Sequence, residues 1–589
     1  MMNTGDTSNG NATAGRIRFW PQVRWTRAAL ILIMTFAMFQ AVLVSSTVPP
    51  WWGPDEDYHW GYASYIDERG SLPDPRKRFY SLEWNKAIVA MNFNQFGQTP
   101  GTSLTGDPHR ATGLMDRLPA SARQPTGEPT RPVMHAPLFH SVVAAVVKPF
   151  AGSSVFTRLW IGRLVNALFA ALAVWAAWLL ASSIFTRAGP QLFVAGLTAV
   201  QPMIAYASGT LTNDMPAIAF FTLAFAAMSF MLRGSPDPRQ GKLLGGAVAL
   251  ALLTKSTAVF LIPFGLAVYA WQWRAYPSLR KPLLKSLRFA AAIPLVLAGW
   301  FYVFLLVKYN TLLGNLGPLN TEVPAASQSI LQLPKMAFTW FSQTYSTYWS
   351  HYIYWEGPRG SIWFWVPAML GGIGLMGFAA WIHRIVTTKQ LGRPLVRQVV
   401  LMTAGVILLV MPFFLIDMQR GLDGNGFMVN GGRFMLPAYP AAACLFTLAL
   451  GELFRPSVQR FVYATVAGVA AIQGLMIWKM KVLDRYFGGV NVDIQGELHR
   501  ASFYRPEFIT NETLSVLIAL VLLTGAAAWV VGVSEGRTPR IPRPGLRSPW
   551  SLRGRRVAGN AVSNGTPAPS STAQPAESSR VEPGQTTLS

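Results

Sequence analysis

Runs of about twenty apolar residues recur along most of this 589-residue chain. An α-helix rises about 1.5 Å per residue, so a run of that length spans the roughly 30 Å hydrocarbon core of a bilayer. The chain is also 51% hydrophobic and only 13% charged, with a positive mean hydropathy. The sequence therefore predicts an all-α polytopic membrane protein.

The net charge of +24 does not indicate a nucleic-acid partner. The basic residues lie mostly in short connections between apolar runs and in the C-terminal segment, which is typical of membrane topology. The first apolar run is too long for a cleavable signal peptide. The single cysteine, Cys444, excludes a disulfide within the chain.

Two segments decide how many times the chain crosses the membrane. Segment 134–152 carries two prolines and a lysine, and segment 243–271 has Lys255 near its middle. If the first lies at the interface and the second forms a short hairpin, every short basic loop falls on one side, as the positive-inside rule requires. We therefore expect about twelve crossings of the plasma membrane, with both termini cytoplasmic. The expected spans are 28–47, 160–184, 190–208, 214–232, 243–254, 257–272, 288–307, 361–382, 398–416, 434–453, 460–480 and 513–533.

The connections on the external face are then long or polar. They are residues 48–159, 308–360, 417–433 and 481–512. Residues 1–27 are expected to be a cytoplasmic tail and 28–533 a transmembrane domain. Residues 534–589, rich in Pro, Arg, Ser and Gly, cannot bury a core and are expected to be a disordered, basic cytoplasmic tail.

An acidic cluster, "PDEDYH", follows the first apolar run on this external face. Pro54 and the acidic residues suit the first turn of a helix, where the helix dipole favours negative charge. Asp55 and His59 would lie four residues apart on one helical face, with Glu56 beside Asp55. Two interpretations stay open: a solvated acidic helix start, or a general base or metal ligand beside the membrane.

Three further polar sites lie on the same predicted face. Asn213 and Asp214 begin the fourth crossing, where helix capping explains one of them better than both. Lys255, beside two hydroxyl side chains, either snorkels or binds phosphate. Arg433 begins a late helix and either anchors it or holds a phosphate bidentately. Together the acidic and basic sites suit a phosphate-bearing lipid substrate and a base that activates an attacking hydroxyl.

The order of these motifs resembles the GT-C superfamily of integral membrane glycosyltransferases, which includes the protein O-mannosyltransferases and the lipid A aminoarabinose transferases. "PDEDYH" resembles the Pro-Asp-Glu-x-x-His motif of an uncharacterised bacterial branch. "HAPLFH", which begins at His135, resembles the start of an interfacial "jaw" helix. Arg163–Leu164, Asn213–Asp214 and "GRFMLP" match further motifs, with Phe434 in place of a tyrosine. The resemblance covers residues 28–440.

The resemblance implies a GT-C-like bundle that transfers a sugar, with inversion, from a polyprenyl-phosphate-linked donor. The acceptor would be an envelope glycan, lipid or protein, and the active site would face outward. Asp55 is implied as the base, with Glu56 beside it, His59 orienting or binding, and Asp214 supporting the site. The residues implied to bind substrate are His135, Arg163, Asn213, Lys255 and Arg433.

The residues do not settle the need for a metal or the exact class of protein. Members of the superfamily differ in their need for a divalent metal, and an acidic pair cannot decide the matter because hard cations take about six oxygen ligands. Mg²⁺ or Mn²⁺ therefore stays an open cofactor. A transporter or flippase of lipid-linked saccharides would use the same basic residues without needing a tight acidic cluster. A polysaccharide polymerase and a non-catalytic scaffold in envelope assembly also stay open.

Overall fold

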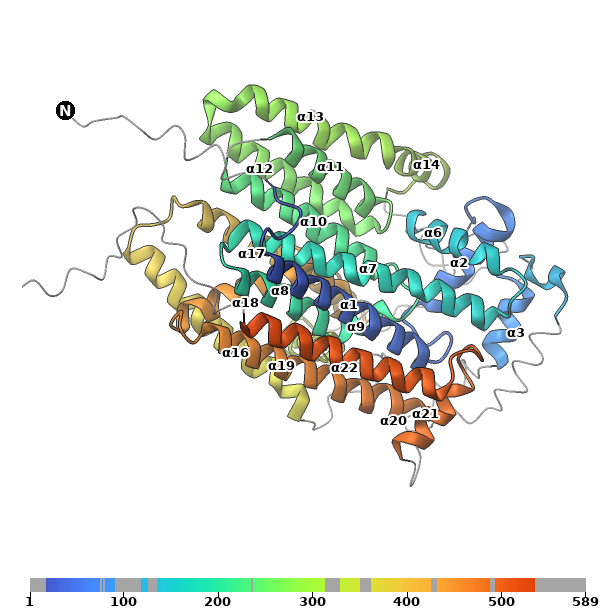
Figure 1. The fold of residues 1–589 in the computed structure, drawn as a ribbon. Helices are drawn as coiled ribbons and strands as arrows, with labels where there is room; N and C mark the ends of the chain where they lie inside the picture. The colour runs from blue at the N-terminus through green and yellow to red at the C-terminus, as the bar shows by residue number, and fades with distance from the viewer. Residues whose placement is uncertain are drawn as a thin grey trace, which may run out of the picture. The chain divides into compact units, whose positions relative to one another are not determined.

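The computed structural model describes residues 17–74, 77, 80–90, 118–125, 135–234, 237–312, 329–349, 362–424, 432–487 and 493–534. Within these ranges the chain is helical, and the only strand-like pairing is an isolated bridge between Ser81 and Pro125. Figure 1 shows the helices and their order along the chain. The predicted all-α class is confirmed. Of the predicted N-terminal tail, residues 17–27 are described, and α1 begins within it at Arg24. The predicted C-terminal tail, 534–589, lies outside the described residues except for Ser534.

Eight described helices are long and apolar enough to cross a membrane. A ninth span results if α13 (Arg280–Leu297) and α14 (Gly299–Tyr309), which meet at a 48° bend, are counted as one. The eight are α1 (Arg24–Thr47), α7 (Val155–Ile184), α10 (Asp214–Arg233), α16 (Ile362–Thr387), α17 (Pro394–Leu422), α18 (Tyr439–Leu453) with the 3₁₀ turn Gly432–Ala438 before it, α19 (Gln459–Trp478) and α22 (Asn511–Ser534).

The remaining expected crossings are helices too short to span alone. Residues 190–208 form α8 (Ala188–Val200) and α9 (Pro202–Ser208), which are separated at Gln201. The expected hairpin is α11 (Pro238–Leu252) and α12 (Leu261–Ala275), joined through the 3₁₀ turn Ser256–Phe260. A span needs about 17–25 residues, so the predicted total of twelve crossings is not confirmed.

The segment expected at the interface forms α6 (Leu138–Val147), a helix of ten residues that is too short to cross a bilayer. It packs on α2 (Glu56–Arg69), and Leu138 N donates to Leu253 O at 2.9 Å. Figure 1 shows α2, α3 (Leu82–Ala90) and α6 gathered near one end of α7. The other described α-helices are α15 (Leu333–Trp349), α20 (Asp484–Phe487) and α21 (Ile494–Ser502), and a π-helical turn, Lys479–Leu483, joins α19 to α20.

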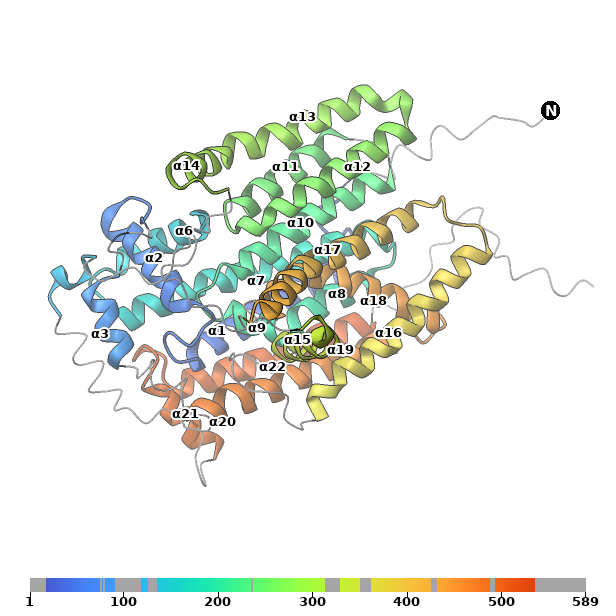
Figure 2. The same ribbon diagram turned by 180° about the vertical axis from the view of Figure 1, so that it is seen from behind.

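Helix α10 is the centre of the bundle. Its apolar window is entirely buried, and it packs against α7, α11 and α17. Figure 2 shows α10 from the far side, with α11, α12 and α13 on one flank and α7 on the other. By contrast, most of the apolar surface of α16 and α22 is exposed, as lipid-facing helices require. A helix buried on all sides holds its first residue, Asp214, in a fixed place.

The predicted topology can be tested by cysteine labelling in intact cells or vesicles. In a Cys444→Ser background, single cysteines at the exposed residues Ser71 and Ser329 should react with an impermeant thiol reagent from outside. A cysteine at the exposed Thr388 should react only after permeabilisation. Labelling of position 388 from outside would contradict the predicted orientation.

Candidate active site

A buried ion pair ties the first two helices to α7. Glu56 Oε1 accepts a hydrogen bond from Arg163 Nε at 2.8 Å, and Oε2 accepts one from Nη2 at 2.6 Å. Both side chains are buried. Arg163 also donates to the carbonyl oxygens of Ser45, Val48 and Pro49 at 2.7–2.9 Å. The guanidinium of α7 therefore holds the end of α1 and the turn into α2 in place.

Glu56 also fixes the loop that leads into α10. Its carboxylate accepts backbone N–H bonds from Trp51 at 3.0 Å, Gly53 at 3.3 Å and Leu211 at 2.7 Å. An added Cβ at Gly53 would lie 2.6 Å from the Thr210 side chain, so this close approach requires glycine. The two oxygens thus accept five hydrogen bonds, including those from Arg163, and their acceptor capacity is used.

Asn166 also holds the loop that leads into α10. It lies three residues beyond Arg163 on α7, on the same helical face. Its Nδ2 donates to the carbonyl oxygens of Thr210 at 2.6 Å and Thr212 at 2.7 Å. The turn before Asp214 is therefore held by α7 and by Glu56 together.

Asp55 is held in an unusual backbone conformation directly before α2. Its φ of 54° lies in the left-handed region, which Asp tolerates better than most residues. Its side chain makes no capping bond to the helix and instead forms an ion pair with Arg433. The Asp55 side chain is 24% exposed, whereas Glu56 is fully buried. Helix capping therefore does not account for Asp55.

A second ion pair joins Asp214 to Lys255. The Oδ2 atom of Asp214 is buried and has no hydrogen-bond partner among the described residues. The Phe434 ring links this pair to the first one, because Lys255 Nζ and Arg433 Cζ lie 5.0 and 4.9 Å from its centroid. The charges of Arg433 and Asp55 also act on the Asp214 carboxylate. Two carboxylates and two cations thus form one cluster.

The position of Arg433 depends on α15. The backbone N–H of Gly432 donates to Thr347 Oγ1 at 2.7 Å. An added Cβ at Gly432 would lie 2.6 Å from Tyr348 N, so a side chain there would separate the two segments. Gln201 Nε2 in turn donates to Tyr348 O at 2.7 Å. This close packing carries Arg433 into the bundle.

Three histidines lie close together, and one of them, His59, lies one helical turn beyond Asp55 on α2. His59 Nδ1 is 2.9 Å from His140 Nε2, and the His135 ring centroid is 5.3 Å from that of His59. Burial lowers the pKa of His59 well below its ordinary value, and His140 and His135 lower it further. Burial likewise lowers the pKa of His140, with His135 adding to the effect. His59 and His140 are therefore neutral near pH 7.

The structure brings the predicted residues into three groups. Asp55, Asp214, Lys255 and Arg433 form the charged cluster. Asn213 Nδ2 donates to Thr254 O at 3.2 Å and so fixes the turn that carries Lys255. The second group is His59 with His135. The third group is the Glu56–Arg163 pair.

A catalytic role for Glu56 and substrate binding by Arg163 stay predictions. Their contacts favour a positioning role, because both side chains are buried and fully engaged with the protein. His140 was not predicted from the sequence. Its signal was available as the final residue of "HAPLFH".

No group of three or more His, Cys, Asp or Glu side chains arranged to hold a metal ion occurs in the part of the chain that the structure describes. Among the described residues, the charged cluster offers two carboxylates, Asp55 and Asp214. An ion that prefers about six oxygen ligands would need the others from water or substrate.

Residues 135–307 match the family model described as dolichyl-phosphate-mannose-protein mannosyltransferase. The matched segment runs from the start of α6 to α14 and contains five of the predicted site residues. They are His135, Arg163, Asn213, Asp214 and Lys255. The match confirms the resemblance of this chain to the GT-C membrane glycosyltransferases. No match was found among curated proteins.

Solved structures also overlap the chain. ArnT from Cupriavidus metallidurans bound to undecaprenyl phosphate is 15% identical, with 86% of this chain and 75% of that chain covered and a TM-score of 0.42. AglB, the oligosaccharyltransferase of Archaeoglobus fulgidus, in complex with an inhibitory peptide and a dolichol-phosphate, is 13% identical. That overlap covers 87% of this chain and 56% of AglB at a TM-score of 0.38.

The Glu56–Arg163 pair should be important for stability. Glu56→Gln leaves the buried Arg163 charge uncompensated, which typically costs about 3–5 kcal/mol. The matched control is Glu452→Gln, which breaks the partly exposed pair Arg384–Glu452 with an N–O distance of 2.7 Å and should cost about 0–1 kcal/mol. Thermal unfolding of the purified variants in detergent measures both. Equal melting temperatures for the two variants would contradict the assigned role.

Because these histidines are neutral in the folded protein, we expect the free energy of unfolding to fall as the pH is lowered. In the unfolded chain a histidine takes up a proton near pH 6.5, whereas the native pKa values of His59 and His140 lie well below that. Between these limits the unfolded state binds more protons, so the free energy of unfolding falls as pH falls, by up to about 1.4 kcal/mol per histidine per pH unit. The charges facing His59 are Asp55, which opposes this shift, and Arg433, which reinforces it.

Melting temperatures measured from pH 8 to pH 5 test this dependence. His140→Asn should flatten the dependence relative to wild type, and the exposed His499→Asn should not. An unchanged slope in His140→Asn would mean that the buried imidazoles do not cause it.

Proposed function

We propose that this chain, a relative of the GT-C membrane glycosyltransferases, transfers a sugar from a polyprenyl-phosphate-linked donor. The acceptor is a hydroxyl-bearing glycan, lipid or protein of the cell envelope, and the reaction takes place on the external face of the membrane. The observation that carries the proposal is the single cluster formed by the ion pairs Asp55–Arg433 and Asp214–Lys255.

The cations of the cluster suit the leaving group. When the sugar leaves, negative charge develops on the lipid phosphate, and preorganised cations stabilise it in a water-poor site. Arg433 offers a planar fork for two phosphate oxygens, and Lys255 adds a point charge. Both cations pair with carboxylates in this structure. A donor phosphate would therefore take the place of those carboxylates.

That exchange would leave Asp55 without its arginine and ready to accept a proton. The acceptor hydroxyl attacks the anomeric carbon opposite the phosphate, and a new carbon–oxygen bond forms. The bond from the anomeric carbon to the phosphate oxygen breaks, the proton passes to Asp55, and polyprenyl phosphate leaves. Attack from the opposite side inverts the anomeric centre. Asp55 suits this role better than Glu56, because its carboxylate is partly exposed whereas Glu56 is fully buried.

The other predicted residues would support this reaction. Asp214 would hold Lys255 until the donor arrives, and Asn213 would fix the turn that carries Lys255. His59 would orient groups beside Asp55. If the reaction needs a divalent cation, Mg²⁺ or Mn²⁺, Asp214 would hold it through its unpaired Oδ2 atom, with the other ligands from water and the donor phosphate.

A transporter or flippase of lipid-linked saccharides is the competing hypothesis outside the enzyme class. It would use the same cations for phosphate and would not depend on a carboxylate that accepts a proton. A polysaccharide polymerase would be a transferase whose acceptor is a growing glycan chain. Replacement of Asp55 should abolish the activity of a transferase and leave that of a transporter largely intact. A growing glycan chain as the acceptor would identify a polymerase.

Asp55→Asn should lower the turnover of sugar transfer by about 10²-fold or more, because a general base typically contributes 10²–10⁴-fold. Donor binding should persist, since Arg433 and Lys255 remain. The control is Asp67→Asn on the same helix, which should keep full turnover. Turnover and donor binding are measured with purified protein in nanodiscs and a radiolabelled polyprenyl-phospho-sugar.

Two results would contradict the proposal. Asp55→Asn with more than about a tenth of wild-type turnover would exclude Asp55 as the base, because the loss would fall well short of the expected range. Transfer by wild type from a water-soluble nucleotide sugar, with no polyprenyl lipid present, would exclude the donor class.

A further inference from the structure

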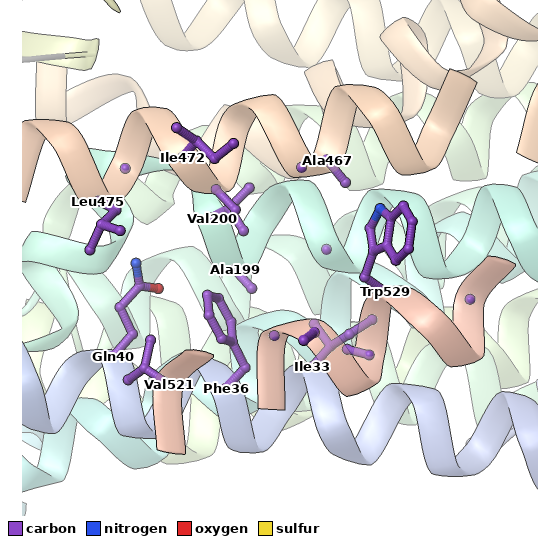
Figure 3. A pocket seen from close by; sticks show the side chains of 18 of the residues that line it. Ile33, Phe36, Gln40, Ala199, Val200, Ala467, Ile472, Leu475, Val521 and Trp529 are labelled. Atoms are coloured by element: carbon purple, nitrogen blue, oxygen red, sulfur yellow. The ribbon is translucent and has the colours of Figure 1, made fainter. Parts of the chain in front are cut away.

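A separate apolar cavity of about 480 Å³ lies between α1, α8, α19 and α22. Figure 3 shows its labelled side chains, with Phe36 and Gln40 of α1 facing Ile472 and Leu475 of α19. Trp529 of α22 closes one side, and its indole N–H donates to Ala464 O at 2.9 Å. This bond holds the wall in place, so the cavity is a built feature of the bundle.

The lining of the cavity suits a hydrocarbon chain. Glycines on three of the surrounding helices, including Gly196, Gly468 and Gly525, leave room between the backbones. Gln40 is the only amide side chain among the residues that line the cavity. A sugar or nucleotide would lose its hydrogen bonds with water in such a site without replacing them. A saturated chain buries apolar surface there at no such cost.

One end of the cavity is basic. Arg460, in the first turn of α19, lines it, and its Nε atom is buried and has no hydrogen-bond partner among the described residues. Arg187, directly before α8, is exposed, and its charge acts on Tyr463, another lining residue. A basic pocket between transmembrane helices is typical of sites that bind anionic lipid head groups.

This basic end is remote from the charged cluster. The lining residues Arg460 and Gly189 lie near the N-terminal ends of α19 and α8. Asp55 lies beyond the C-terminal end of α1. None of the residues in the charged cluster lines the cavity. The ligand of this cavity is therefore distinct from the proposed sugar donor.

We propose that this cavity binds one acyl chain of an anionic glycerophospholipid, whose phosphate contacts Arg460. The lipid fills the gap between α22 and the helices α8 and α19, and Arg460 selects a negatively charged head group. The proposal does not depend on sugar transfer, because it rests on the lining and charge of the cavity alone.

Leucine substitutions in the cavity test the acyl-chain part of the proposal. An added Cβ at Gly196 meets nothing within 4 Å, and at Gly468 it meets only the Trp529 indole nitrogen at 3.9 Å, so both positions accept leucine without a backbone clash. Gly196→Leu and Gly468→Leu should each weaken the binding of phosphatidylglycerol at least about tenfold, since excluding two methylene groups is enough for that loss. The matched control, Gly372→Leu, adds the same side chain on the exposed face of α16, where a Cβ also meets nothing.

The measurement is native mass spectrometry of the delipidated full-length protein titrated with phosphatidylglycerol, phosphatidylcholine or polyprenyl phosphate. Wild type and Gly372→Leu should retain one phosphatidylglycerol in preference to phosphatidylcholine. Arg460→Met should bind the two phospholipids equally, because it keeps the apolar stem and removes the charge.

Several outcomes would overturn the proposal. One is that both cavity leucine variants bind phosphatidylglycerol as tightly as wild type does. Another is an unchanged head-group preference in Arg460→Met. Displacement of phosphatidylglycerol by polyprenyl phosphate in wild type would assign the cavity to the donor lipid. A wild-type dimer that both cavity leucine variants convert to a monomer would assign it to a second copy of the chain.

Discussion

The buried pair between Glu56 and Arg163 is the interaction on which the arrangement of the candidate site depends. Removing two charges from water costs several kcal/mol for each ion, and only a fully hydrogen-bonded pair offsets that cost. Here Glu56 accepts five hydrogen bonds, and Arg163 donates to three backbone carbonyl oxygens as well. The pair joins segments that are more than 100 residues apart in the sequence, and it holds α1, α2, α7 and the loop before α10 in one arrangement.

Two neighbouring carboxylates thereby acquire different environments. Glu56 points into the bundle, where Arg163 holds it, and Asp55 lies on the other side of a left-handed turn, where it meets Arg433 and solvent. Environment, rather than residue type, decides whether a carboxylate can exchange protons, and we propose that exchange for Asp55 only. The left-handed φ of Asp55 is the local consequence, because Glu56 fixes the chain on one side and Arg433 fixes it on the other.

The same junction brings the second ion pair to the first. Leu211 N donates to Glu56, and Asn166 holds the carbonyl oxygens of the neighbouring turn, so the start of α10 is positioned relative to α2. Asp214 then meets Lys255 from the α11–α12 hairpin. A cluster assembled from four separate segments is sensitive to any change that moves one of them.

The sequence predicted the helical membrane class, the two short helices on either side of Lys255 and the short helix after His135, because hydropathy and helix length are local signals. It also named all four members of the charged cluster, but it did not predict which carboxylate pairs with which cation. The bonds of Glu56 with Arg163 and of Asp55 with Arg433 cross 107 and 378 residues, and no local pattern encodes such contacts. The number of membrane crossings could not be predicted either. Helices of 13–15 residues, such as α8, α11 and α12, are too short to span alone, and hydropathy does not show how deeply they enter the bilayer.

The most direct measurement is an electron cryomicroscopy structure of the full-length protein in nanodiscs with polyprenyl phosphate bound. We expect phosphate density within hydrogen-bonding distance of Lys255 Nζ and the Arg433 guanidinium, with both cations turned away from Asp214 and Asp55. Phosphate density elsewhere, with the two ion pairs intact, would contradict it.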